Sequence, residues 1–130
     1  MIAVDTNVWI RYVTNDDPEQ AQRALALLEK ASRVFLPKTV LLEVEWVLRA
    51  VYDLPRDAVR NTLLHILGLE KVIPEEAEQI ALGMALYEKG LDFADALHLA
   101  STGAGTTFHS FDAALVKGAR AAGADAAAVP

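Results

Sequence analysis

Hydrophobic residues recur along this chain in two alternating patterns: short runs typical of buried strands, and longer stretches with helical spacing. The short runs predict strands at 2–4, 33–36, 70–73 and 106–109, with a weak edge strand at 126–129. Helical spacing fills the segments between them, at about 8–13, 18–31, 37–52, 58–67, 76–88, 92–101 and 111–121. Parallel strands are joined by crossover helices, so this alternation predicts an α/β fold with a mainly parallel sheet of four to five strands.

Several helix ends carry recognisable signals. Asp17 can cap a helix whose first position is Pro18, and Gly90 can end the helix before it. A long helix is expected from Pro37 to about Tyr52, and the acid–base pair Glu45 and Arg49 lies one turn apart on its side. Its apolar stripe comprises Val40, Val44, Val47, Leu48 and Val51.

The composition favours one compact domain over 1–130. The chain is 53% hydrophobic, which is compatible with a full core and a buried subunit interface, and we find no repeat or linker. Without cysteine there are no disulfides, thiolate zinc sites or thiol nucleophiles. We expect neither a signal peptide nor a membrane span, because no apolar run reaches about 18 residues. The expected location is the cytoplasm.

Four carboxylates lie within or directly after the most apolar stretches: Asp5, Glu43, Asp95 and Asp112. Burying like charges together is costly unless a cation joins them, so this arrangement indicates a divalent metal. Oxygen donors without sulfur suit Mg²⁺ or Mn²⁺ better than zinc. Asp5 and Asp112 follow predicted strands, and ligands of parallel sheets collect at the carboxyl ends of strands.

The net charge of −6 does not by itself decide for or against nucleic acid. Without the four candidate ligands, 14 acids face 12 bases, and the remaining charge is only −2. A bound cation would offset part of the negative charge of the four candidate ligands. A nucleic-acid substrate would therefore be held through the metal and a few local bases.

Each acid also has a purely structural interpretation. Asp5 can cap the turn from strand to helix, and Glu43 can be a solvated helix residue. Asp92 is favoured as a helix N-cap with Asp95 three residues later, although Asp92 can also serve as an outer ligand. Asp112 can simply be an acid near a helix start, where the helix dipole favours negative charge.

Segment 1–12, which includes Asp5, Thr6 and Asn7, resembles the opening of PIN-domain nucleases of the VapC toxin type. Three later segments resemble the second, third and fourth acidic motifs of that family in the same order: 42–49, 92–98 and 110–112. The resemblance spans nearly the whole chain. It implies a three-layer α/β/α fold with a short central sheet.

The resemblance also implies the site and its partners. It assigns Asp5, Glu43, Asp95 and Asp112 as the catalytic and metal-holding acids and Mg²⁺ or Mn²⁺ as cofactor. The expected activity is endoribonuclease cleavage of RNA by the toxin of a toxin–antitoxin pair, with a homodimer and a cognate antitoxin as partners. Supporting roles in orienting carboxylates or water fall to Thr6, Asn7, Asp92 and Ser110. The family often places a basic residue where this chain has Ala113.

The residue types fit that chemistry independently. Phosphodiester cleavage needs a nucleophilic hydroxide, neutralised phosphoryl charge and assistance to the leaving oxygen, which carboxylate-held metals can supply. We expect Asp5 and Asp95 to hold the principal metal. Arg11, one turn after Asn7, is the candidate RNA contact. Other bases that could flank the site are Lys38, Arg49, Lys117 and Arg120.

Other α/β classes fit less well. A two-component receiver domain needs an aspartate after its central strand, where this chain has Pro74. A dinucleotide-binding domain needs a glycine-rich first turn, and a haloacid-dehalogenase-like phosphatase needs aspartate at position 7, which is Asn7. The remaining alternative is a catalytically inert PIN-like scaffold that binds nucleic acid or protein.

Overall fold

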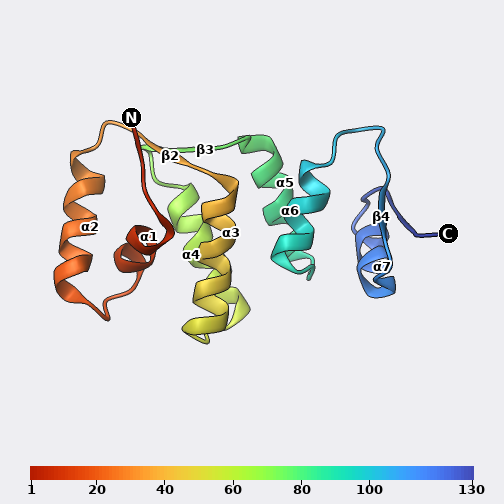
Figure 1. Cartoon of the computed structure of the whole chain (residues 1–130), viewed down its shortest axis with the longest axis horizontal. Helices are drawn as coiled ribbons and strands as arrows, with labels where there is room; N and C mark the ends of the chain where they lie inside the picture. Colours follow the sequence, from red (N-terminus) through yellow and green to blue (C-terminus); the bar gives the residue numbers. More distant parts are fainter. The chain divides into compact units, whose positions relative to one another are not determined.

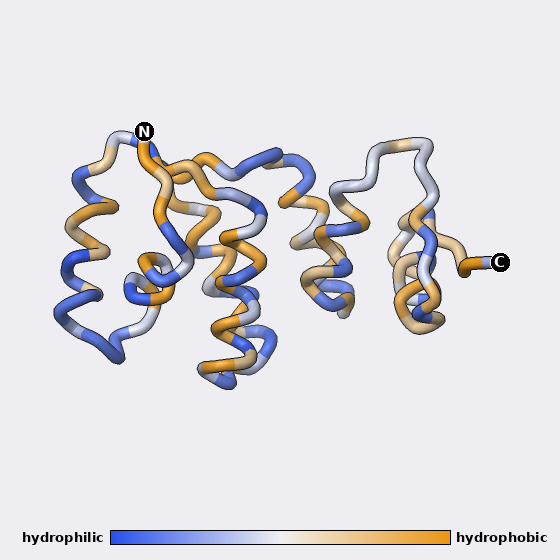
Figure 2. The backbone as a smooth tube through the Cα atoms, viewed as in Figure 1, coloured by the Kyte–Doolittle hydropathy of each residue, from blue (hydrophilic) through white to orange (hydrophobic).

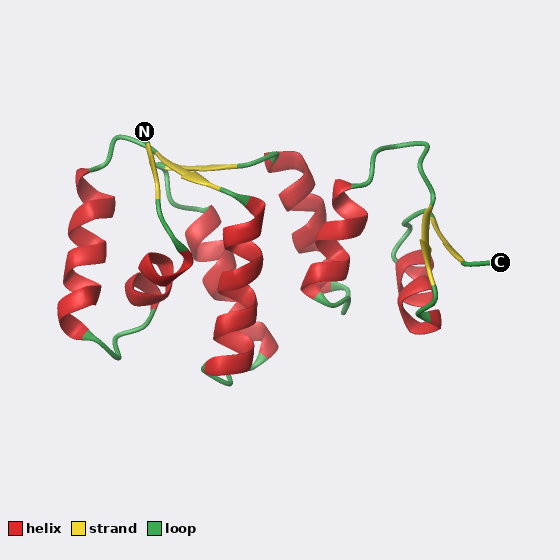
Figure 3. Cartoon of the chain, in the orientation of Figure 1, coloured by secondary structure: helices red, strands yellow, loops and turns green.

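The computed structural model describes residues 1–130, and the chain divides into two compact units. Unit 1 is Met1–Glu75 and unit 2 is Glu76–Pro130. Both units alternate short strands with helices, as the sequence predicted (Figures 1 and 3). The expectation of a single domain over 1–130 stays a prediction.

Unit 1 is built on a three-stranded parallel sheet. Its strands are β1 (Ile2–Ala3), β2 (Val34–Leu36) and β3 (Val72–Pro74), in the order β1-β2-β3. Ile2 pairs with Val34, which pairs in turn with Val72. The helices are α1 (Thr6–Val13), α2 (Pro18–Lys30), α3 (Lys38–Trp46) and α4 (Arg56–Leu67), with the π-helix η1 (Val47–Val51) after α3.

The long helix expected over 37–52 changes character halfway. The N–H of Tyr52 donates to the carbonyl of Val47 at 3.1 Å, a bond that spans five residues rather than four. Asp53 follows with a positive φ of 53°, which ends the helix. Because each residue of a π-helix rotates less about the axis, Val51 leaves the apolar stripe and is 63% exposed. The prediction that Val51 shares this stripe was wrong.

The core of unit 1 consists of side chains from the sheet and from one face of each helix. Trp9, Leu36, Leu41, Leu63 and Ile66 have no exposed surface. Figure 2 shows the corresponding change between hydrophobic and hydrophilic residues along each helix. The burial of Leu41 and Trp9 holds the ends of α3 and α1 in place, which positions the polar residues beside them.

Unit 2 contains α5 (Ala77–Glu88), α6 (Phe93–Ser101), β4 (Phe108–Ser110), α7 (Ala113–Ala121) and β5 (Ala126–Ala128). Helices α5 and α6 lie side by side (Figure 1). Gly83 permits their close approach, because a Cβ atom there would lie 2.8 Å from Cδ2 of Leu97. The rings of Tyr87 and Phe93 meet edge to face at 4.9 Å, and both side chains are 1% exposed.

The sequence-based fold prediction is confirmed in class: this is an α/β chain whose strand pairs are all parallel. Where we expected one sheet, the five strands form hydrogen-bonded sheets of three and two strands. In the second, β4 pairs with β5, with Phe108 opposite Ala126. No helix has the length and apolar character needed to cross a membrane.

Candidate active site

Asp5 lies where strand β1 gives way to helix α1. It is the N-cap of α1, and its Oδ1 accepts a hydrogen bond from the backbone N–H of Thr6 at 2.7 Å. The carboxylate is exposed. The capping interpretation is therefore correct, and it leaves oxygen lone pairs available because a carboxylate accepts several hydrogen bonds or a metal.

Thr6 connects the first predicted acid to the second. Its side chain is buried at 5% exposure, and its hydroxyl donates to Oε1 of Glu43 at 3.3 Å. Glu43 projects from α3, and its side chain is exposed. One residue thus contacts both Asp5 and Glu43, which are far apart in sequence. The predicted role of Thr6, orienting carboxylates or metal-bound water during catalysis, stays a prediction.

The buried acid of α3 is Glu45, not Glu43. Glu45 is 1% exposed, and its Oε2 accepts a hydrogen bond from Nε of Arg49 at 2.9 Å in the predicted pair one turn apart. Three of the four candidate ligands, Asp5, Glu43 and Asp112, are exposed. The premise that all four acids are buried in apolar surroundings was therefore wrong: apolar neighbours in sequence pack inward while these side chains point outward.

Unit 2 brings Asp92 and Asp95 together at the start of α6. Oδ2 of Asp92, the N-cap, accepts from the backbone N–H of Asp95 at 3.2 Å. This confirms the predicted cap. Asp95 occupies the first turn of the helix, and its side chain is only partly exposed. The helix start orients both carboxylates, since the exposed N–H groups there attract negative charge.

Asp112 is the N-cap of α7, where its Oδ1 accepts from the N–H of Leu115 at 3.0 Å. Ser110 fixes the approach to this cap, because its hydroxyl oxygen accepts from the N–H of Asp112 at 2.9 Å. Ser110 therefore holds the backbone that presents Asp112. Its predicted role in orienting carboxylates or metal-bound water stays a prediction.

The acids of unit 2 influence one another electrostatically. Partial burial raises the pKa of Asp95 above its ordinary value of 3.8, and the negative charges of Asp92 and Asp112 raise it further. His98, one turn along α6, acts in the opposite direction. A carboxyl group with a raised pKa in a cluster of acids is a group that a cation would stabilise in its charged form.

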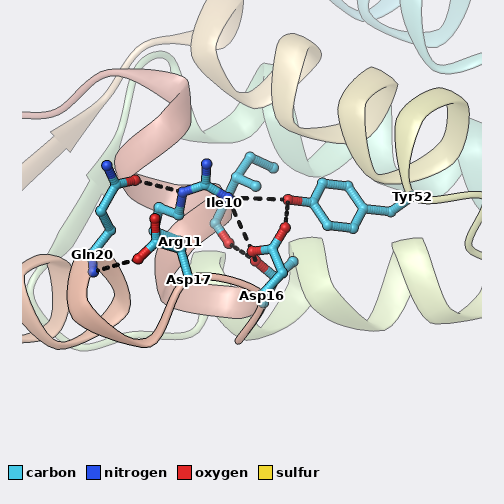
Figure 4. A network of polar contacts seen from close by, with 7 residues as sticks. Ile10, Arg11, Asp16, Asp17, Gln20 and Tyr52 are labelled. Atoms are coloured by element: carbon cyan, nitrogen blue, oxygen red, sulfur yellow. Dashed lines mark hydrogen bonds and ion pairs between the residues drawn. The ribbon is translucent and has the colours of Figure 1, made fainter.

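Arg11, the predicted RNA contact, is held by partners within unit 1 (Figure 4). Its Nε donates to Gln20 at 2.7 Å, and its Nη1 lies 3.0 Å from Oδ1 of Asp16. The hydroxyl of Tyr52 donates to the other oxygen of Asp16 at 2.7 Å, and this bond lowers the pKa of Asp16 more than any other contact. Arg11 is thus oriented by the fold rather than freely mobile.

A cavity of about 410 Å³ lies beside this network, between α1 and α2. Asn7, Arg11 and Gln20 line its polar part, together with Arg23, a residue that the sequence analysis did not single out. Asn7 is exposed one turn before Arg11 on the same helix. The expectation that these two residues share a surface is met by their joint lining of this cavity.

Two of the other predicted bases, Arg49 and Arg120, make side-chain contacts within the fold. Arg49 is paired with Glu45, and Nε of Arg120 donates to the carbonyl of Ala126 at 2.7 Å. The backbone N–H of Lys38 donates to Oε1 of Glu75 at 2.9 Å. Lys117 is exposed on α7. Arg49 therefore supports the helical segment that carries Glu45, and Arg120 connects helix α7 to strand β5.

Each unit contributes donors suited to a hard cation. Within neither unit do three or more histidine or acidic side chains form a group that could hold a metal ion. Instead unit 1 offers Asp5 and Glu43, and unit 2 offers Asp95 and Asp112 with Asp92 beside them. All are oxygen donors, and the raised pKa of Asp95 marks the place where added positive charge is most favourable. The donor chemistry fits Mg²⁺ or Mn²⁺.

Comparison with known families gives one match. The model of the PIN domain matches residues 2–120, which is most of the chain. No curated protein matches the chain.

Proposed function

Because the chain belongs to the PIN-domain family, we propose that it is a Mg²⁺- or Mn²⁺-dependent endoribonuclease and the toxin of a toxin–antitoxin pair. PIN domains are generally nucleases and typically bind divalent metals. The observation that carries the proposal is the group of carboxylates at the starts of α6 and α7, where partial burial and then the charges of Asp92 and Asp112 raise the pKa of Asp95. A cation bound there would favour the charged form of Asp95.

We assign the metal to Asp5, Glu43, Asp95 and Asp112. When bound, the ion would neutralise phosphoryl charge and make a hydroxide nucleophile accessible near neutral pH. The chain's own residues orient these ligands. Thr6 restrains Glu43 through its hydroxyl, Ser110 fixes the backbone of Asp112, and the N–H of Asp95 restrains Asp92. Such partners keep ligands in place without contacting the metal.

The substrate contacts and partners follow from the same proposal. Arg11 would contact RNA from the cavity beside α1, and Asn7, which lines the same cavity, would orient carboxylates or water. A homodimer and a cognate antitoxin are the proposed protein partners, and the cytoplasm is the proposed location. On α5, Leu86 is 3% exposed and packs within the chain. Leu82, at 50% exposure, remains on the surface.

The test is cleavage of a panel of structured and single-stranded RNAs by the purified protein in Mg²⁺ or Mn²⁺. EDTA and Asp5→Asn are the controls, and circular dichroism verifies that the variant is folded. We expect cleavage that both controls abolish. Folded protein that cleaves no RNA in either metal, or cleavage that persists in EDTA, would contradict the proposal. The first result would favour the inert scaffold.

A further inference from the structure

Phe111 is the most exposed large hydrophobic side chain of the protein, at 89% exposure. Covering a phenylalanine side chain from water stabilises a protein by roughly 1.5–3 kcal/mol, and the fold gains little of this here. The other aromatic rings of unit 2 are covered: Tyr87 and Phe93 are buried, and Phe108 is partly exposed and stacks on His98 at 6.4 Å. Phe111 is therefore the most exposed of the phenylalanine and tyrosine rings of unit 2.

The backbone on both sides of Phe111 is fixed. The carbonyl of Ser110 accepts from the N–H of Val129 at 3.3 Å, and the Ser110 hydroxyl accepts from the N–H of Asp112 at 2.9 Å. Asp112 is in turn held by the N–H of Leu115. The backbone that carries the exposed ring is thus held between strand β4 and the N-cap of helix α7. Because this backbone is already held, less conformational entropy is lost when a planar ligand stacks on the ring.

The position of Phe111 points to the substrate. Consecutive Cα atoms are about 3.8 Å apart, so the ring begins one residue away from Asp112, a proposed metal ligand. A nucleotide whose phosphate approached Asp112 would bring its base within reach of this ring. Bases of single-stranded RNA are commonly held by stacking on aromatic side chains.

The charge of unit 2 favours stacking over phosphate contacts. Residues 76–130 carry three basic side chains against seven acidic ones, a formal charge of −4. Of the three bases, Lys89 donates to the carbonyl of Ala122 at 3.3 Å and Arg120 to that of Ala126. An RNA strand near this unit gains little from ion pairs. Stacking depends on the π face of a base rather than on its charge, so it suits such a surface.

We propose that Phe111 stacks on one base of the single-stranded RNA substrate, next to the phosphodiester bond that is cut. This inference rests on the proposed nuclease function. It makes Phe111 a determinant of substrate binding, with no part in bond breaking.

The first test compares wild type with Phe111→Ala and Phe111→Tyr on a short unstructured RNA that the wild type cleaves. Replacement by alanine should raise KM roughly tenfold, equivalent to about 1.4 kcal/mol and within the range of base–aromatic stacking. The kcat should change little, and tyrosine should restore KM. Leu82→Ala, which also removes an exposed apolar side chain of unit 2, is the matched control and should leave KM unchanged.

A second readout identifies the base. Abasic nucleotides are placed one at a time along the RNA, and KM is measured for wild type and Phe111→Ala. Wild type should lose affinity at one position beside the cut, and Phe111→Ala should show no sensitivity there. A purely structural role for Phe111 would not produce this position-specific effect. Equal KM for wild type and Phe111→Ala, or an unchanged abasic profile, would overturn the proposal.

Binding without turnover separates this inference from the nuclease proposal. The affinity of a fluorescein-labelled RNA is measured by anisotropy for Asp5→Asn with and without Phe111→Ala. Tenfold weaker binding in the double variant supports stacking even if the wild type cleaves nothing, which would reject only the nuclease. Unchanged RNA affinity together with loss of self-association would assign Phe111 to a protein interface and reject stacking.

Discussion

In unit 1 the exposed carboxylates of Asp5 and Glu43 each accept a hydrogen bond from Thr6, Asp5 from its backbone N–H and Glu43 from its hydroxyl, whereas in unit 2 the negative charges of Asp92 and Asp112 act on Asp95. Partial burial and the neighbouring charges of Asp92 and Asp112 raise the pKa of Asp95. Hydrogen bonds from Thr6 hold Asp5 and Glu43, whereas burial and the neighbouring charges disfavour the charged form of Asp95. The difference teaches that nearby positive charge would stabilise the charged form of Asp95, while Asp5 and Glu43 are oriented by hydrogen bonds from Thr6.

The largest effects should come from the proposed principal ligands. Asp5→Asn and Asp95→Asn should each lower kcat/KM for RNA by more than the roughly 10–100-fold typical of outer-shell partners. Amide replacement keeps the shape but removes the charge that holds the metal. Steady-state kinetics with matched circular dichroism spectra checks this. If either folded variant keeps an activity within a few fold of wild type, the substituted residue is not a principal metal ligand.

Two acids of the same helix should respond in opposite ways. Glu45→Gln should lower the free energy of unfolding by about 1–3 kcal/mol, because it breaks a buried pair whose partner Arg49 is 42% exposed and can be solvated. It should leave RNA cleavage nearly intact. Glu43→Gln should abolish cleavage while changing stability little, since its side chain is exposed.

Urea unfolding and cleavage rates, measured on both variants, provide the check. The same pattern in both variants, with stability and activity lost together, would contradict the separation between a structural and a functional carboxylate on α3.

Removal of the link between Asp5 and Glu43 should have an intermediate effect. Thr6→Val keeps the buried shape but removes the hydroxyl that donates to Glu43, and it should lower kcat/KM about tenfold, as for other orienting groups. Thr6→Ser retains the hydroxyl and is the control. Cleavage kinetics on one RNA distinguishes the two, and equal rates for valine and serine would show that the hydroxyl does not matter.

The smallest predicted effect concerns pH. The raised pKa of Asp95 means that the folded protein binds this proton more tightly than the unfolded chain. In EDTA, the contribution of Asp95 to stability should therefore fall as pH rises from its ordinary value of 3.8 through the raised folded pKa. Asp95→Asn should be free of this decline and more stable than wild type at neutral pH.

Urea unfolding of both proteins over a pH series isolates the contribution of Asp95 as their difference. Asp92→Asn should reduce the difference, because it removes one of the charges that raises the pKa. A wild type that gains stability relative to Asp95→Asn as pH rises would show that the sign is wrong.

Much of this fold was predictable from local patterns. The caps at Asp17 and Asp92 were predicted because short polar side chains precede helical spacing, and both accept the expected backbone N–H bonds. The positive φ of Gly90, 103°, confirms the end of α5. Each predicted strand lies within about two residues of the observed one. These features depend on a few neighbouring residues, which the sequence displays directly.

Other features depend on packing that sequence neighbours do not reveal. Glu43 and Glu45 have similar apolar neighbours, yet one is exposed and the other is buried, because the face of α3 is set by its contacts. The π-helix at Val47–Val51 has no local signal of its own. Neither the exposure of Phe111 nor the bonds that hold Arg11 followed from spacing, since both depend on where distant residues lie.

The most direct test of the central claim is Mn²⁺ binding, followed by the electron paramagnetic resonance of the free ion. The proposal names both Asp5 and Asp95 as ligands of the metal. Asp5→Asn and Asp95→Asn should therefore each weaken binding at that site by at least about tenfold. If Asp95→Asn loses the ion while Asp5→Asn binds it as tightly as wild type, Asp5 is not a ligand of the metal and the claim is wrong.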